Sequence, residues 1–412
     1  MSNIYDKWER LVEAVIRREQ IWQMFHDQSP SVSSISSDFS LDYQVIDMPF
    51  DFSSPGGSST YQQLFPPAVE NLRKKETSVE KGDSGLVFIQ GFNPAFDLDN
   101  MLNSIAGFLG KGTFGSAYMA AMDNGITVVL KRLNVVNMPE KKFRQHLEVI
   151  ANVRHENVSA LRAYYSSKDE KLMVFDHYSN GSVSAMLHGE SWKCYYTNQF
   201  IFSSTQEKNG ENRAQLDWET RLRIAVGAAR GIAHIHKKSG GKLVHGNIKS
   251  SNIFLNSQEY GCVSDLGMAN MIAIPVIRTA GYHAPEVKNT RDASQASDVY
   301  SFGILLLELL TRKSPSHVIG GVEVVDLVKL VNSVKGKEQT ANVFDVELLR
   351  NRNVEEKMVK MLQIGMSCVA KTPRKRPKMD EVVKMMEVDY ERQNSETTAL
   401  IEMQILNCRL VV

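Results

Sequence analysis

Residues 245–252 read HGNIKSSN, a loop in which the position two residues after the histidine is an amide, Asn247. An asparagine oxygen can accept a hydrogen bond and orient a hydroxyl group, but at neutral pH it cannot take up the proton that leaves. One positioned general base is commonly worth roughly 10²–10⁴ in rate. A loop of this composition would therefore hold a reacting group in place with greatly reduced turnover.

Two segments upstream are compatible with phosphate binding. Residues 109–118 read LGKGTFGSAY, and Gly110, Gly112 and Gly115 would let backbone N–H groups close over phosphate oxygens. The β-branched run TVVLKRL that follows predicts a strand with Lys131 near its end. Taken alone, the glycine pattern is equally typical of an ordinary turn, and the lysine of a surface cation.

Several motifs follow the loop in a fixed order. Residues 263–267 read VSDLG, in which the carboxylate of Asp265 can hold Mg²⁺. The others are APE at residues 284–286, SDVYSFG at residues 297–303, and the pair Arg376-Pro377. Their common order and spacing exclude a chance match to the loop.

With these motifs, residues 86–387 resemble the intracellular domain of plant leucine-rich-repeat receptor-like kinases. The HGNIKSSN loop and VSDLG resemble the members classed as inactive. The resemblance implies an α+β, two-lobed protein-kinase-like fold, with a small β-rich N-lobe, a larger helical C-lobe and a partly disordered N-terminal extension.

We expect the chain to divide into five parts. Before the kinase domain come an amphipathic helical segment (1–28) and a disordered Ser/Pro/Gly-rich linker (29–84). The kinase domain consists of the N-lobe and hinge (85–178) and the C-lobe (179–390) with an aromatic insertion (190–213), and a tail (391–412) follows it. The first segment packs on a lobe or on a partner. The sequence of this segment faintly resembles the amino terminus of plant callose synthases, which would make the chain a fusion or the product of a mispredicted gene. The insertion is either a docking surface or translated intron sequence.

The resemblance also assigns site residues. The catalytic group contains Asn247 in place of the base aspartate, Lys249 and Thr279. The nucleotide-binding group contains Gly110, Gly112, Gly115, Lys131, Phe175, Asp176 and Tyr178. The Mg²⁺ ligands would be Asn252 and Asp265.

The partner of Lys131 stays open. Active kinases hold this lysine with a glutamate on the next helix. The family places that glutamate nine residues before the position of His155, where this chain has His146. Glu148 lies two residues further on, about 200° around the helix, so it faces away unless the helix shifts its register. Glu148 is therefore either the lysine partner or an exposed carboxylate.

Three residues of the C-lobe carry structural expectations. Asp298 precedes a long apolar run and would brace the catalytic loop, with a helix N-cap as the alternative. Glu286 and Arg376 would form a buried ion pair whose loss leaves one charge unpaired.

The segment from Asp265 to Glu286 predicts that phosphorylation does not switch the site by the usual route. Its hydroxyl groups are those of Thr279 and Tyr282. The arginine that would receive a phosphate, just before the base, is Gly246.

Composition sets wider limits. The 412 residues are 42% apolar and 23% charged, enough for a two-lobed domain with an extension, and the net charge of +1 favours neither nucleic-acid nor polybasic membrane binding. The four cysteines show no metal or disulfide spacing, which favours reduced cytosol. The sequence predicts no signal peptide and no membrane span. We expect a cytoplasmic chain, which the resemblance places at the cytoplasmic face of the plasma membrane.

Three functional hypotheses follow. The chain is a pseudokinase that binds ATP and Mg²⁺ and signals by binding other receptor-like kinases or signalling proteins. Alternatively, it is a weak Ser/Thr kinase, because phosphoryl transfer passes through a loose transition state with little early need for deprotonation. In the third hypothesis it is a nonfunctional fragment, as the insertion and the foreign-looking amino terminus indicate.

Overall fold

The computed structural model describes residues 86–89, 105–112, 114–122, 125–134, 138–166, 171–189, 216–272, 281–315, 317–319, 323–333, 343–350 and 354–387. The predictions for the N-terminal helix, the linker, the aromatic insertion and the tail lie outside these residues, as does Thr279.

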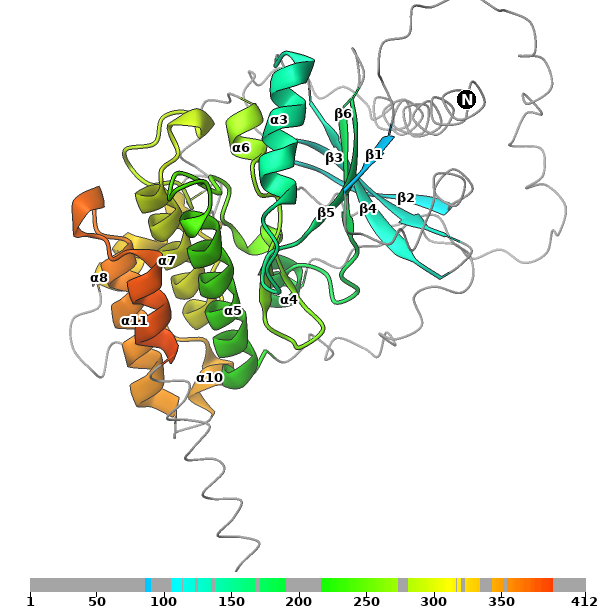
Figure 1. Cartoon of the computed structure of the whole chain (residues 1–412). Coiled ribbons are helices and arrows are strands. Elements are labelled where there is room, and N and C mark those ends of the chain that lie inside the picture. Colours follow the sequence, from blue (N-terminus) through cyan, green and yellow to red (C-terminus); the bar gives the residue numbers. More distant parts are fainter. Residues whose placement is uncertain are drawn as a thin grey trace, which may run out of the picture.

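The N-lobe is built on one antiparallel sheet with the strand order β1-β5-β6-β4-β3-β2 (Figure 1). Its strands are β1 (Leu86–Phe88), β2 (Ile105–Gly112), β3 (Gly115–Ala121), β4 (Thr127–Leu133), β5 (Leu161–Ser166) and β6 (Lys171–Asp176). The predicted strand that carries Lys131 is β4, which pairs with β3 on one side and β6 on the other. The expected start of ordered structure at residue 86 corresponds to β1.

The C-lobe is mainly helical. Its helices are α4 (Val183–His188), α5 (Trp218–Lys237), α6 (Met268–Met271), α7 (Gln295–Thr311), α8 (Leu327–Ser333), α10 (Val346–Leu349) and α11 (Glu355–Cys368). Two small hairpins accompany them: β7 (Ile253–Leu255) with β8 (Gly261–Val263), and β9 (His317–Ile319) with β10 (Glu323–Val325). The structure thus confirms the α+β, two-lobed fold.

One helix of the N-lobe, α3 (Glu140–Ala151), lies beside the sheet (Figure 1). Its buried residues Phe143, Leu147 and Ile150 follow helical spacing and form one apolar face. This face belongs to a cluster that also contains Leu266 and Met268, from the segment after the catalytic loop. The position of α3 is therefore tied to that of the VSDLG segment.

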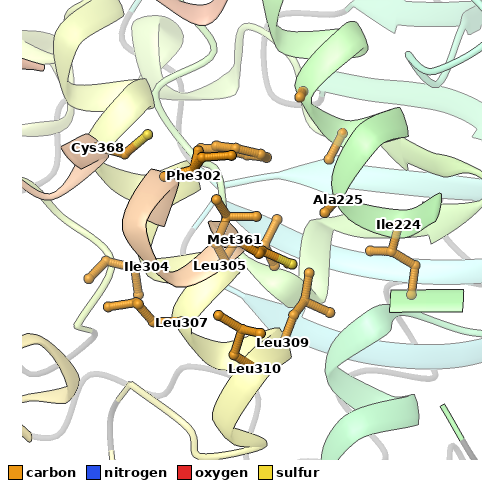
Figure 2. Close-up of a cluster of buried hydrophobic side chains, with 14 of the residues drawn as sticks. Ile224, Ala225, Phe302, Ile304, Leu305, Leu307, Leu309, Leu310, Met361 and Cys368 are labelled. Carbon is orange, nitrogen blue, oxygen red and sulfur yellow. The ribbon is translucent and has the colours of Figure 1, made fainter. Parts of the chain in front are cut away.

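The core of the C-lobe forms where α5, α7 and α11 meet (Figure 2). Ala225 of α5, Phe302 and Leu305 of α7, and Met361 and Cys368 of α11 are among its buried side chains. Burial of one large apolar side chain stabilises a fold by about 1.5–3 kcal/mol. Nearly every residue of α7 is buried, so this helix is a rigid base for the loops attached to it.

A buried charge cluster that the sequence analysis did not identify joins α5, α7 and α10. The guanidinium of Arg221 donates to the carbonyls of Leu216 and Leu309, at 2.7 Å each, and to the carboxylate of Asp345. Arg312 donates to Glu347 at 2.6 Å beside it. Each buried charge therefore has a partner, as burial requires.

The predicted ion pair between Glu286 and Arg376 is confirmed. The guanidinium of Arg376 donates to both carboxylate oxygens of Glu286, at 2.6 and 2.9 Å. The Arg376 side chain is completely buried, whereas that of Glu286 is 32% exposed. Burial acts to raise the pKa of Glu286, but the hydrogen bonds and charge of Arg376 outweigh it and hold this pKa below its usual value.

We expect Arg376→Met to lower the free energy of unfolding by about 2 kcal/mol or more, less than for a fully buried pair because Glu286 is partly solvated. Because the pKa of Glu286 is lowered in the folded state, the pair stabilises the fold above the unfolded-state pKa. This contribution is lost as the pH falls through the folded-state pKa. Urea unfolding from pH 7 to pH 4 should show the difference from the parent protein shrinking towards acid.

Arg374→Met removes an exposed cation two residues away and is the matched control. Equal losses for the two variants, or a difference that does not change with pH, would contradict the assigned role of the pair.

Candidate active site

The catalytic loop is held by hydrogen bonds to the carboxylate of Asp298 on α7. One oxygen of this carboxylate accepts the backbone N–H of Gly246 and the other that of His245, both at 2.8 Å. The ring of His236, at the end of α5, lies 2.9 Å from the carboxylate. The N-cap of α7 is Ser294, with a capping box to Ser297, so the bracing role of Asp298 is confirmed and the N-cap alternative is wrong.

Hydrogen bonds inside the loop link it to the VSDLG segment. The His245 ring donates from Nε2 to the carbonyl of Ser264 at 2.8 Å, and its Nδ1 accepts the N–H of Asn247 at 3.2 Å. The Asn252 amide donates to the carbonyl of Asn247 at 2.9 Å. These bonds fix the backbone around Asn247, whichever side chain stands there.

Beneath the glycine-rich loop lies a small hollow that is partly open to solvent. Its lining brings together seven of the predicted site residues: Gly112, Gly115, Lys131, Asn247, Lys249, Asn252 and Asp265. The hollow also touches Arg132, and the buried ring of Phe114 from the glycine-rich loop forms part of its wall. Groups that could hold phosphate and a reacting hydroxyl therefore share one space.

Of the other predicted site residues that the structure describes, none lines this hollow. Gly110 lies earlier on β2, and Phe175 is buried with the Lys131 ammonium 5.4 Å from its ring centroid. Asp176 accepts two hydrogen bonds from Arg162. The ring of Tyr178 stacks on Phe254, and its hydroxyl lies 3.2 Å from Cys262 Sγ. Their contribution to nucleotide binding stays a prediction.

Lys131 forms an ion pair with Asp265. Asp265 has the left-handed φ of 70°, a strained backbone conformation that turns its side chain into the hollow. Burial, and secondly the ammonium of Lys249, lower the pKa of Lys131 to about 7, while the adjacent carboxylate favours its charged form. The lysine and the aspartate thus compensate each other directly.

Helix α3 presents His146, not a carboxylate, to this region. The His146 ring donates from Nε2 to the carbonyl of Gly267 at 2.9 Å. Gly267 has a φ of +83°, and a Cβ there would come within 2.2 Å of the Ile150 side chain, so only glycine allows this approach of α3. Glu148 is exposed, as the spacing argument predicts.

In this arrangement the carboxylate that would hold a divalent cation is already engaged by a side chain. Mg²⁺ prefers oxygen ligands in near-ideal octahedral geometry. The two candidate donors are one carboxylate, Asp265, which is already paired with Lys131, and one amide, Asn252. Within the described part of the chain, no group of three or more His, Cys, Asp or Glu side chains could hold a metal ion. Mg²⁺ binding by Asn252 and Asp265 stays a prediction.

A second buried network supports the loop from below. The carboxylate of Glu308, on α7, accepts the hydroxyls of Ser250 at 2.9 Å and of Tyr282, and it lies 2.8 Å from the His188 ring. Burial, and secondly the charge of Glu308, raise the pKa of Tyr282 well above its usual value, so the phenol remains a donor. The sequence held a signal for this network, namely one acidic residue inside the apolar run of α7.

Gly246 stands where the resembled family has an arginine, and the structure leaves little room there for any side chain. Its φ is +76°, and a Cβ at this position would lie 2.7 Å from the Cβ of Ala269 and 3.2 Å from that of Ala293. The space beside the loop is therefore filled by two alanines. A larger side chain fits only if these neighbours move.

We expect Gly246→Ala to lower the free energy of unfolding by more than the roughly 1 kcal/mol that a positive φ costs alone, because the new methyl group also meets Ala269. Gly241→Ala is the matched control: its φ is +77°, but a Cβ there meets nothing closer than 3.9 Å. Thermal and urea unfolding of both variants measure the difference. Equal losses would show that crowding at Ala269 plays no part.

With this geometry in place, the class of protein is clear: the molecule has a protein-kinase fold whose catalytic loop lacks the base. The family model for protein tyrosine and serine/threonine kinases matches residues 104–386. The chain belongs to this family, and within it to the plant receptor-like kinases whose members carry names that call them inactive.

One such relative, from Arabidopsis thaliana, is named a probable inactive receptor kinase and is 53% identical over 312 residues, which are 75% of this chain and 46% of the relative. Some related sequences are of the leucine-rich-repeat type. The chain spans about half the length of most of the curated relatives it matches.

Two solved structures share the fold. The pseudokinase domain of BIR2, described as an immune regulator of the RLK/Pelle family, has a TM-score of 0.59 and 27% identity, covering 75% of this chain and 91% of that one. The kinase domain of maize sucrose-induced receptor kinase 1, bound to AMP-PNP, has a TM-score of 0.59 and 26% identity, covering 74% and 99%. Among the described residues of the present chain, no helix is both long and apolar enough to span a membrane.

Proposed function

We propose that this protein is a pseudokinase, which binds ATP in the hollow beneath its glycine-rich loop and signals by binding partner kinases or other signalling proteins. The observation that carries the proposal is Asn247. It lines the hollow on a loop that is otherwise fully braced, at the place where a kinase has its general base.

ATP binding is supported by the residues gathered in the hollow. Lys131 and Lys249 supply positive charge to phosphate groups, and Gly112 and Gly115 let the backbone approach closely. The similar maize kinase domain holds a nucleotide analogue.

The relation to receptor kinases supports a site of action at the cytoplasmic face of the plasma membrane, in contact with receptor-like kinases. A chain without phosphotransfer would influence signalling through such contacts.

A weakly active Ser/Thr kinase is the second candidate. It is favoured by the clustering of Lys131, Asn252 and Asp265 around the same hollow as Asn247. Positioning and electrostatics supply much of the rate of phosphoryl transfer, and the amide of Asn247 can still orient a hydroxyl.

We expect the parent protein to transfer no more phosphate from ATP than its Lys131→Met variant, because Asn247 leaves the reacting hydroxyl without a proton acceptor. If the base is the decisive loss, Asn247→Asp raises the rate by roughly 10²-fold or more, because a carboxylate restores that acceptor in an already fixed loop. Radiolabel transfer to a generic protein substrate and to the chain itself measures both rates.

The double variant Asn247→Asp, Lys131→Met controls for contaminating kinases and should be inactive. Parent activity clearly above that of Lys131→Met would refute the pseudokinase proposal and support the weak kinase. Failure of Asn247→Asp to gain activity would show that the base is not the decisive loss.

A further inference from the structure

The carboxylate that the family uses for metal is already neutralised by a side chain in this protein. Asp265 is in an ion pair with Lys131, and both side chains are largely buried, with 7% and 14% exposure. A divalent cation would have to displace the ammonium from a site with low access to water, where separating opposite charges is costly.

The reason for this pairing lies on α3. Its inward residue, His146, is engaged with the carbonyl of Gly267, and Glu148 points to solvent. In the described part of the chain, α3 therefore offers no carboxylate to Lys131. Asp265 is the anion that remains within reach of this ammonium.

The charge of the hollow favours an anion. Lys131, Arg132 and Lys249 line it, opposed by one carboxylate, Asp265. With the lysines charged, these four residues sum to +3 − 1 = +2. These side chains thus offset part of the negative charge of a triphosphate. Lys131 can serve Asp265 and a phosphate oxygen together because an ammonium has three donors.

We propose that this hollow binds a nucleoside triphosphate without a divalent cation, with the Lys131 ammonium standing where the metal would bridge Asp265 and the phosphates. The inference rests on the proposed binding of ATP and specifies its chemistry. A metal-free complex also fits a protein without phosphotransfer, since the metal's role in neutralising charge at the transferring phosphate is not needed.

Isothermal titration of the full chain with ATP tests the proposal, in excess EDTA and separately in excess Mg²⁺, with Mg²⁺ alone as the blank. We expect ATP to bind in EDTA with an affinity equal to or higher than that in Mg²⁺. Binding that requires Mg²⁺ would overturn this inference and leave the proposed ATP binding intact. Absence of binding in both buffers would overturn both.

Two variants locate the effect. Asp265→Asn removes the carboxylate that competes with phosphate for Lys131, so we expect ATP to bind more tightly in EDTA, whereas a metal-dependent site would lose its ATP binding in Mg²⁺. Lys131→Met should weaken binding in EDTA by about tenfold or more, equal to about 1.4 kcal/mol. Lys141→Met, an exposed cation on α3, is the matched control and should bind as the parent does.

Circular dichroism and the melting temperature check that each variant is folded. Loss of binding in folded Asp265→Asn, or unchanged binding in folded Lys131→Met, would contradict the proposal.

Discussion

The catalytic loop depends on one buried carboxylate. Asp298 is 1% exposed, and it is compensated by two backbone N–H groups of the catalytic loop and by the His236 ring. Burying a charge in this way is tolerated only when hydrogen bonds replace the lost water, and charge-assisted bonds to the backbone are among the strongest. The helix α7 that carries Asp298 is itself almost wholly buried, so the loop is attached to the packed core of the C-lobe.

This arrangement explains how the loop can lose its chemistry and keep its shape. The bonds to Asp298 come from main-chain groups of His245 and Gly246, and the bond from Asn252 reaches the main chain of Asn247. None of them requires a particular side chain at residues 246 and 247. Glycine at 246 relieves the strain of a positive φ, and an amide at 247 occupies nearly the volume of a carboxylate. Structure and catalysis are therefore separable at residue 247, whereas residue 246 is tied to glycine by its φ and by its two alanine neighbours.

Much of this could be predicted from the sequence, because the motifs fix both order and backbone geometry. The strand that carries Lys131 follows from a local pattern, and the bracing by Asp298 and the pair Glu286–Arg376 follow from the family resemblance. The network around Glu308 and the cluster around Arg221 were missed, since their partners lie up to 124 residues away along the chain. Helical spacing shows that such a charge is buried, but only the tertiary fold shows what compensates it. The partner of Lys131 stayed open for the same reason.

His146, Gly246 and Asn247 each differ from the residue that an active kinase has at that position, and each difference disfavours phosphoryl transfer. An active kinase holds its lysine from α3 and keeps its aspartate available for metal, so that nucleotide, metal and base are aligned at once. Here α3 is held instead by a neutral contact from His146 to Gly267, and the lysine turns to Asp265. This ion pair joins charged groups of the two lobes without any metal, because opposite charges in a poorly solvated hollow attract strongly. A site organised in this way is suited to holding an anionic ligand in a fixed conformation. At residue 247 it offers no general base for the transfer of a phosphate.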